Sequence, residues 1–364
     1  LFYERFMKEE DITLISPHQA PGLYEAFGTE DFDDLYLKYE ADKTIPKKTV
    51  PAQDLFFDLL KERAETGRIY IMNLDHCNSH SSFKDKVSMS NLCQEITLPT
   101  TPIQDIHDEQ GEIALCILSA VNVGALNDLG ELENICDLSV RALEQIIDYQ
   151  DYPVKAAEVS TKKRRSLGIG YIGLAHYLAK HGVKYSDPKA WEVVDRLSEA
   201  FQYHLLRASC DIAMEKGKCE GFERTKYADG QLPIDHYKKD VDEIVPHKQR
   251  MAWESLRKDI AKHGLRHSTL SAQMPSESSS VVSNETNGIE PPRALLSIKK
   301  SKKGPLKQIA PGFPKLKNDY TLLWEMPDNT GYINVVAMMQ KYFDQAISGN
   351  WSYNPLKFEN NEVP

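Results

Sequence analysis

Three side chains capable of chemistry alternate along residues 90–95: an amide at Asn91, a thiol at Cys93 and a carboxyl at Glu95. Alternate side chains of an extended segment point to one face, so we expect these groups to converge on one small volume, with the outer pair about 7 Å apart. Apolar residues flank them, which favours a site that excludes water. The alternative is an ordinary half-buried strand with a core cysteine, because free cysteine is among the most buried residue types.

A second cysteine, Cys116, lies in the apolar run 112–120, which is typical of a buried strand. The run between the two cysteines carries Pro99, Pro102 and Gly111, so the chain must turn back there. The sequence therefore predicts one shielded thiol between an amide and a carboxyl, and another thiol on a strand.

A serine-rich segment could bind an anion. Residues 269–280 read Thr-Leu-Ser-Ala-Gln-Met-Pro-Ser-Glu-Ser-Ser-Ser, which predicts a strand over the first four residues and, from Pro275, a turn into a helix. A helix start offers unpaired N–H groups and a positive dipole end. Hydroxyls of Ser276, Ser278 and Ser279 add donors, a combination that suits a phosphate or diphosphate. The alternative is a plain serine-rich N-cap.

Taken together, these motifs resemble a known family. Asn-Leu-Cys-x-Glu-Ile-x-Leu-Pro-Thr from residue 91, Gly-Glu-Ile-Ala-Leu-Cys ending at residue 116, and the serine segment continued by Ser-Asn-Glu-Thr-Asn-Gly-Ile-Glu-Pro-Pro-Arg are similar to the large, catalytic subunit of class I ribonucleotide reductase. The resemblance runs across essentially all 364 residues. It implies an α/β architecture, about half of that family's ten-stranded α/β barrel, with Cys93 on a central finger loop.

The resemblance also implies a reaction, the reduction of ribonucleoside diphosphates to 2′-deoxyribonucleoside diphosphates by thiyl-radical chemistry. Cys93 would carry the radical that takes the 3′ hydrogen, Glu95 would be general base on the 3′ hydroxyl, and Asn91 would orient the ribose hydroxyls. Cys116 would be one of two thiols that supply the electrons and end as a redox-active disulfide. Carried over as substrate-binding residues are Asn91, Leu92, Cys93, Glu95, Pro275, Ser276, Glu277, Ser278 and Ser279.

The family's remaining functional parts are absent from these residues. They are the N-terminal half with the partner cysteine of Cys116 and the effector regions, and the C-terminal radical-relay tyrosines and redox cysteines. We therefore interpret residues 1–364 as the C-terminal portion of the catalytic barrel domain. Activity would require the N-terminal half in cis or in trans, a metal-containing, radical-generating small subunit, and thioredoxin or glutaredoxin. The chain itself would bind no cofactor, nucleotide effectors such as ATP would bind elsewhere in the full enzyme, and the large subunit would dimerise.

Two alternatives to a reductase component remain. One is a non-catalytic assembly fragment of the same complex. The other is a different radical enzyme with a similar barrel, such as a glycyl-radical enzyme, which would need a C-terminal glycyl loop that is not visible in this sequence.

The composition limits the possible functions. The chain carries 44 Lys and Arg against 54 Asp and Glu, a net charge of -10, which argues against a nucleic-acid-binding surface. It contains no run of 18 apolar residues and no signal peptide, so we expect no membrane span. Six cysteines in a chain of this length do not form a disulfide scaffold and fit a reducing, cytoplasmic environment.

Two further motifs suggest functions that their contexts disfavour. Asp-His-Cys-Asn-Ser-His at 75–80 invites a metal interpretation, but no second cluster with zinc-like spacing follows, so we predict a polar loop and no metal. Gly-Ile-Gly-Tyr-Ile-Gly at 168–173 matches a dinucleotide fingerprint, but the charged run 161–165 precedes it where a strand is required. We expect these glycines to allow close packing instead.

The intervening segments must position these groups. Apolar periodicity predicts helices over 52–66, 132–149, 187–216 and 253–263, and a final helix from 329–330 that runs to 347. We also predict a short buried strand at 68–72 and an exposed turn between two strands at 299–304. The thiols of Cys136, Cys210 and Cys219 are expected to be structural.

Overall fold

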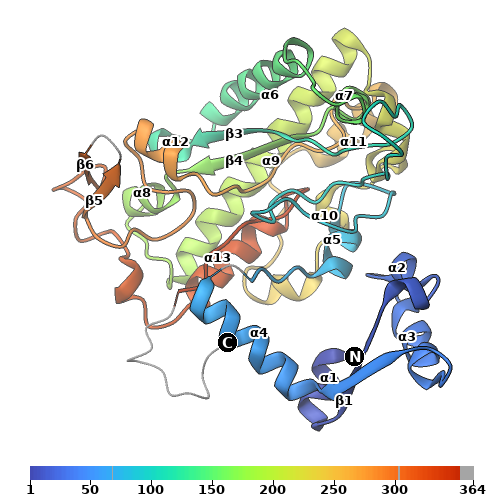
Figure 1. Ribbon diagram of the computed structural model, residues 1–364. Helices are drawn as coiled ribbons and strands as arrows, with labels where there is room; N and C mark the ends of the chain where they lie inside the picture. Colours follow the sequence, from blue (N-terminus) through green and yellow to red (C-terminus); the bar gives the residue numbers. More distant parts are fainter. Residues whose placement is uncertain (68, 302–303, 353–364) are drawn as a thin grey trace. The chain divides into compact units, whose positions relative to one another are not determined.

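The computed structural model describes residues 1–67, 69–301 and 304–352, without the side chains of 299–301 (Figure 1). The chain forms two compact units, Leu1–Asn78 and Ser79–Pro364, and each is described by itself. None of the described helices is both long and apolar enough to cross a membrane.

The first unit is a two-stranded antiparallel sheet with helices. Its elements are α1 (Phe2–Lys8), β1 (Asp11–Ile15), η1 (Pro17–Gln19), α2 (Leu23–Ala26), α3 (Asp31–Ala41), β2 (Lys47–Pro51) and α4 (Ala52–Thr66). Tyr36 connects α3 to strand β1. Its hydroxyl accepts a hydrogen bond from the Thr13 N–H at 2.8 Å and donates one to the Thr13 carbonyl at 2.7 Å. Helix α4 matches the prediction and ends at Gly67, whose φ of 63° is left-handed.

Two predictions near the end of this unit are wrong. Residues 69–73 form no strand; Tyr70 and Ile71 are 51% and 55% exposed, and no described strand pairs with them. Arg68 lies outside the described residues. The segment expected to be a polar loop is the helix α5 (Leu74–His80). No group of three or more His, Cys, Asp or Glu side chains that could hold a metal occurs in the described parts of the chain.

The second unit is centred on a parallel strand pair. Strand β3 (Ile117–Asn122) pairs with β4 (Leu167–Ile172), with Ile117 opposite Leu167. At the other edge of β4, Ser271 forms a parallel bridge to Ile169, and Gln273 bridges in turn to Ile347. Helix α6 (Glu131–Tyr149) packs on β3 and on α9 (Pro188–Lys216), as Figure 1 shows. The expected α/β architecture is confirmed, but the named strands form only two-stranded sheets, and the described residues contain no closed barrel.

The other elements of this unit are mostly helices and a hairpin. They are η2 (Val123–Ala125), α7 (Lys155–Arg164), α8 (Leu174–Lys180), η3 (Glu220–Arg224), η4 (Lys226–Asp229), α10 (Pro233–His236), η5 (Lys239–Glu243), α11 (Trp253–His263), α12 (Glu277–Val282), β5 (Leu296–Ser301), β6 (Gly304–Ile309), η6 (Leu323–Glu325) and α13 (Thr330–Gln340). The helices predicted at 132–149, 187–216 and 253–263 are confirmed to within one residue. Strands β5 and β6 confirm the predicted pair, whereas positions 302–303 of the predicted turn lie outside the described residues.

Three extended or helical predictions in this unit need correction. The final helix ends at Gln340 rather than 347, because the backbone of 345–348 bonds to distant extended segments instead. The run 112–120 becomes a strand only at Ile117 and is half-buried, with Leu118 42% exposed. Residues 269–272 make bridge contacts rather than a full strand.

The glycine motif at 168–173 permits close packing, as expected. Strand β4 is buried along its whole length. A Cβ added to Gly168 would lie 2.9 Å from the Cys116 Sγ, and one added to Gly170 would lie 2.5 Å from the Ala272 carbonyl oxygen. The first two glycines therefore lie within the strand, where they admit a cysteine and a neighbouring backbone.

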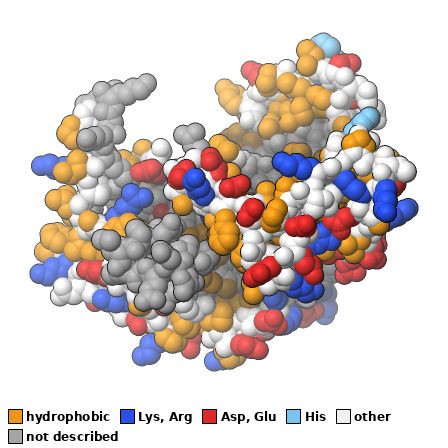
Figure 2. Space-filling model, turned by 60° about the horizontal axis from the view of Figure 1, so that its bottom comes forward, with side chains coloured by type: hydrophobic (Ala, Val, Ile, Leu, Met, Phe, Trp, Pro, Cys, Tyr) orange, Lys and Arg blue, Asp and Glu red, His pale blue; other side chains and the backbone are white. Residues whose placement is uncertain are grey.

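Buried cysteines in this unit are structural, as predicted. Cys136, Cys210 and Cys219 are at most 2% exposed and join the main hydrophobic core. On the face in Figure 2, acidic and basic side chains of the described residues are interspersed, without a continuous basic patch.

Candidate active site

Cys93 lies at the tip of a tight turn. The Asn91 N–H donates to the Ile96 carbonyl at 3.1 Å, and the Ile96 N–H donates to the Asn91 Oδ1 at 3.1 Å. Gln94 has a φ of 65°, which is left-handed. The prediction of an extended segment is therefore wrong, because the Asn91 side chain captures a backbone N–H and folds the chain back. The core-cysteine alternative also fails, since Cys93 is only partly buried and Leu92 beside it is 78% exposed.

Glu95 is fixed at the base of this turn with one free carboxylate oxygen. Its side chain is buried, and no described group bonds its Oε2. The Ala346 N–H donates to the Glu95 carbonyl at 3.1 Å, and the Thr97 N–H donates to the Gln345 Oε1 at 2.7 Å. A buried acceptor without a donor is costly in a folded protein, so this oxygen marks a position for a ligand or water.

The carboxylate of Glu95 lies near both thiols. Burial and the Glu95 charge raise the pKa of Cys93. Burial, then Asp344, then Glu95 raise the pKa of Cys116 well above its ordinary value. The charge of the Glu95 carboxylate therefore acts on both thiols.

A small hydrophobic cluster connects the two cysteine segments. Ile96 and Leu98 follow the turn and pack with Phe83 and Ala272, and Cys116 packs against this cluster. The Cys116 segment is thereby held beside the segment that follows Cys93.

The serine segment begins the short helix α12 without capping it. The Ser276 hydroxyl donates to the Met274 carbonyl at 3.0 Å, and the helix has no side-chain cap bond, so the plain N-cap alternative is wrong. Ser278 and Ser279 are exposed, and no described group bonds their hydroxyls. Their donors remain available to an external acceptor.

Backbone pairing joins the serine segment to the Glu95 segment. The Ala346 N–H donates to Glu95, and the Gln273 N–H donates to the Ala346 carbonyl at 3.2 Å. Residues 345–348 therefore lie between the two segments, and Pro275 follows Gln273 by two positions. A cavity of about 490 Å³ touches Pro275 and Glu277, but its lining does not include the turn at 91–95.

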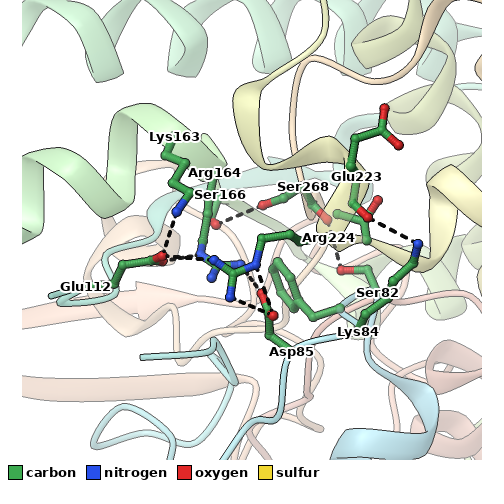
Figure 3. Close-up of polar contacts among 12 residues, drawn as sticks. Ser82, Lys84, Asp85, Glu112, Lys163, Arg164, Ser166, Glu223, Arg224 and Ser268 are labelled. Carbon is green, nitrogen blue, oxygen red and sulfur yellow. Dashed lines mark hydrogen bonds and ion pairs between the residues drawn. The ribbon is translucent and has the colours of Figure 1, made fainter. Parts of the chain in front are cut away.

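A buried ion cluster that the sequence analysis missed braces both cysteine segments. Figure 3 shows Arg164 between two carboxylates: its Nε donates to Glu112 at 2.5 Å and its Nη1 to Asp85 at 3.0 Å. Lys163 and Arg224 complete the cluster at 3.0 Å and 3.4 Å from Glu112. Burial acts to raise the pKa of Glu112, but hydrogen bonds from Arg164 and Lys163 hold it below its ordinary value.

This ion cluster lies beside the loop that connects the Cys93 segment to the Cys116 segment. Glu112 also forms an antiparallel bridge with Thr101, with two N–H···O bonds of 3.0 Å, which closes the loop from 101 to 112. Asp85 lies eight residues before Cys93, and Glu112 four residues before Cys116. The charged run at 161–165 was the sequence signal for this ion cluster, but the sequence alone does not show which carboxylates pair with its basic residues.

Comparison with known proteins identifies similar chains. The model of the family "Ribonucleotide reductase, barrel domain" matches residues 1–361. The chain is 55% identical to the ribonucleoside-diphosphate reductase subunit alpha of Buchnera aphidicola subsp. Baizongia pistaciae and 54% identical to ribonucleoside-diphosphate reductase 1 subunit alpha of Escherichia coli, over 100% of this chain and 48% of each relative. Identity to the subunit alpha of Enterobacteria phage T4 is 41%, over 100% of this chain and 49% of that protein. The chain thus spans about half the length of these relatives.

Proposed function

Because this chain belongs to the ribonucleotide reductase barrel-domain family, we propose that it is a catalytic component of ribonucleoside-diphosphate reductase. It would reduce ribonucleoside diphosphates to 2′-deoxyribonucleoside diphosphates. The observation that carries this proposal is the buried carboxylate of Glu95, which has one oxygen without a described partner and whose charge raises the pKa of both Cys93 and Cys116.

The turn at 91–96 serves as the finger loop of about half of a ten-stranded barrel. Support comes from the parallel pair β3 and β4, which continues through Ser271 and Gln273 to Ile347. A ladder of this kind supports a position for the turn beside one strand layer, and the rest of the full protein would supply the opposite half.

Each residue of the turn has a distinct role in this proposal. A thiyl radical on Cys93 takes the 3′ hydrogen atom of the ribose and returns it at the end of the cycle. Glu95 accepts the 3′ hydroxyl proton through its free Oε2. The Oδ1 of Asn91 is already bonded to Ile96, so its amide N–H groups are the part left to orient ribose hydroxyls.

Cys116 acts with a second thiol as the source of electrons. The two thiols give up two hydrogens and two electrons and join as a disulfide. The 2′ hydroxyl leaves as water, and its carbon gains one C–H bond, so the balance is one ribonucleotide and two thiols to one deoxyribonucleotide, one water and one disulfide.

The substrate diphosphate lies on the serine segment. Exposed hydroxyls of Ser278 and Ser279 and the start of α12 support this position, with Pro275, Ser276 and Glu277 at its edge. No lysine is needed, because backbone N–H groups and hydroxyls carry the contacts.

Turnover depends on further parts. We propose that the chain works with the N-terminal half of the large subunit, in cis or in trans, and with a small subunit whose metal centre supplies the radical. Thioredoxin or glutaredoxin would regenerate the thiols, nucleotide effectors would bind outside this chain, and the large subunit would form dimers in the cytoplasm.

Substitution of one cysteine in the assembled reductase tests this proposal. Cys93→Ser removes the radical-bearing sulfur and should abolish deoxynucleotide formation. Cys77→Ser is the matched control, because that thiol is also partly buried and belongs to α5, and it should keep activity. Full activity of Cys93→Ser would reject the catalytic role and leave an assembly component.

A further inference from the structure

Asp344 is a buried carboxylate surrounded by donors, and the proposed mechanism does not use it. It is 1% exposed and follows α13 by four residues. Its Oδ1 accepts from the Thr269 hydroxyl and the Ser271 N–H, each at 2.8 Å, and its Oδ2 accepts from the Tyr227 hydroxyl at 2.7 Å. The Leu270 N–H also donates, at 3.0 Å to Oδ2.

Through these bonds and those of its neighbours, Asp344 connects the segment before the serines to the Glu95 segment. It clamps the extended segment 269–271, which leads into the serine segment. The next two residues along the chain, Gln345 and Ala346, bond to Thr97 and to the Glu95 backbone. Displacement of Asp344 would therefore disturb the phosphate side and the carboxylate side together.

Cys116 lies on the other side of strand β4 from the segment that Asp344 binds. Its Sγ sits against Gly168, and the adjacent Ile169 bridges to Ser271, whose N–H and hydroxyl both bond Asp344. Neighbouring strands lie about 5 Å apart, which places the thiol within range of the carboxylate charge. Burial is the largest influence that raises the pKa of Cys116, and the charges of Asp344 and Glu95 raise it further.

The hydrogen-bond donors around Asp344 favour its charged form. Burial raises its pKa, and the hydrogen bonds from Tyr227, Ser271 and Thr269 act in the opposite direction. A protonated carboxyl must present its own hydrogen to an acceptor, yet the two backbone N–H groups that touch it can only donate. A filled ring of donors favours the charged form.

We infer that Asp344 is a positioning residue for this reaction, because its buried carboxylate fixes the segment before the serines and keeps the neighbouring Cys116 as a protonated thiol. This inference rests on the function proposed for Cys116. A thiolate there would lack the hydrogen that each of the two reducing thiols must give up before the disulfide forms. Burial and the charge of Asp344 both oppose that loss before substrate is bound.

Alkylation of Cys116 in the full large subunit tests the charge directly, with the modified peptide measured by mass spectrometry. Asp344→Asn keeps the shape and removes the charge, so the iodoacetamide rate at pH 8 should rise about tenfold, equal to a pKa fall of about 1. The rate with anionic iodoacetate should rise further still, because a repelling charge has gone. Tyr227→Phe is the control, since it removes one hydrogen bond to Asp344 but keeps the charge, and both rates should stay unchanged.

Comparison of the two reagents distinguishes loss of the Asp344 charge from a general opening of the structure around Cys116. Equal acceleration by iodoacetate and iodoacetamide in Asp344→Asn would indicate an opened structure and overturn the inference, as would no acceleration. Should that variant fail to fold, the unsubstituted protein can still overturn the inference: its Cys116 rate should keep rising through pH 10, whereas a thiol of pKa about 8.5 levels off. A plateau by pH 9 would overturn the inference. These readouts need no turnover, so they are independent of the Cys93→Ser result.

Discussion

Glu112→Gln should weaken the ion cluster that braces the two cysteine segments. The side chains of Glu112 and Arg164 are 4% and 3% exposed, so among the described residues the glutamine leaves Arg164 with Asp85 as its charged partner. Lys163 and Arg224 are 25% and 43% exposed and can regain water. Because one buried cation loses a charged hydrogen bond but keeps another, we expect a loss of about 2–3 kcal/mol in the free energy of unfolding.

Urea denaturation, followed by tryptophan fluorescence, measures this change. Glu158→Gln is the matched control: its carboxylate pairs with Lys155 and Lys162 on the exposed face of α7, so it should cost less than about 0.5 kcal/mol. Equal, small effects of the two substitutions would show that the buried cluster does not brace the fold and would refute this reasoning.

Three further predictions follow from the geometry. Gly168→Ala should destabilise the protein by about 1–3 kcal/mol in urea denaturation, because the new Cβ would lie 2.9 Å from the Cys116 Sγ; an unchanged midpoint would contradict the close packing. Replacing Ser278 and Ser279 together by Ala should raise the KM for the nucleoside diphosphate about tenfold in steady-state assays with kcat retained, and an unchanged KM would remove them from the phosphate site. Burial raises the pKa of Glu144, but hydrogen bonds from a histidine and two arginines lower it to about 2. Its contribution to stability should therefore be complete above pH ~4.3 and be lost as the pH falls toward 2 in urea titrations, and Glu144→Gln should abolish that part of the pH dependence.

Local patterns in the sequence predicted the helices well. The helix from Ala52 ends at Gly67, and the one from Trp253 ends at Gly264, because a glycine after an apolar periodic run is a local stop signal. The helices at 131–149 and 188–216 were equally clear, since each carries an apolar face along its length.

The predictions that failed concern segments whose structure depends on pairing with residues far away in the sequence. The final helix stops at Gln340 because the chain after it pairs with Ser271, Gln273 and Glu95, which are 70 or more residues away. The predicted strand at 68–72 has no pairing partner in the described chain, so β-propensity alone did not suffice.

The sequence analysis expected an extended segment at 91–95, and this local geometry was wrong. Asn91 closes a turn there instead, and the charge of Glu95 acts on the thiols of Cys93 and Cys116. Asp344 could not be assigned from the sequence, because its partners lie about 75 residues or more before it.

A single turnover without external reductant tests the central claim most directly. The assembled reductase, loaded with one ribonucleoside diphosphate per site, would be quenched and digested, and the state of each cysteine would be read by mass spectrometry. We predict one disulfide that includes Cys116 for each deoxynucleotide formed, with Cys93 recovered as a thiol. Deoxynucleotide formation with Cys116 still fully reduced would contradict the account.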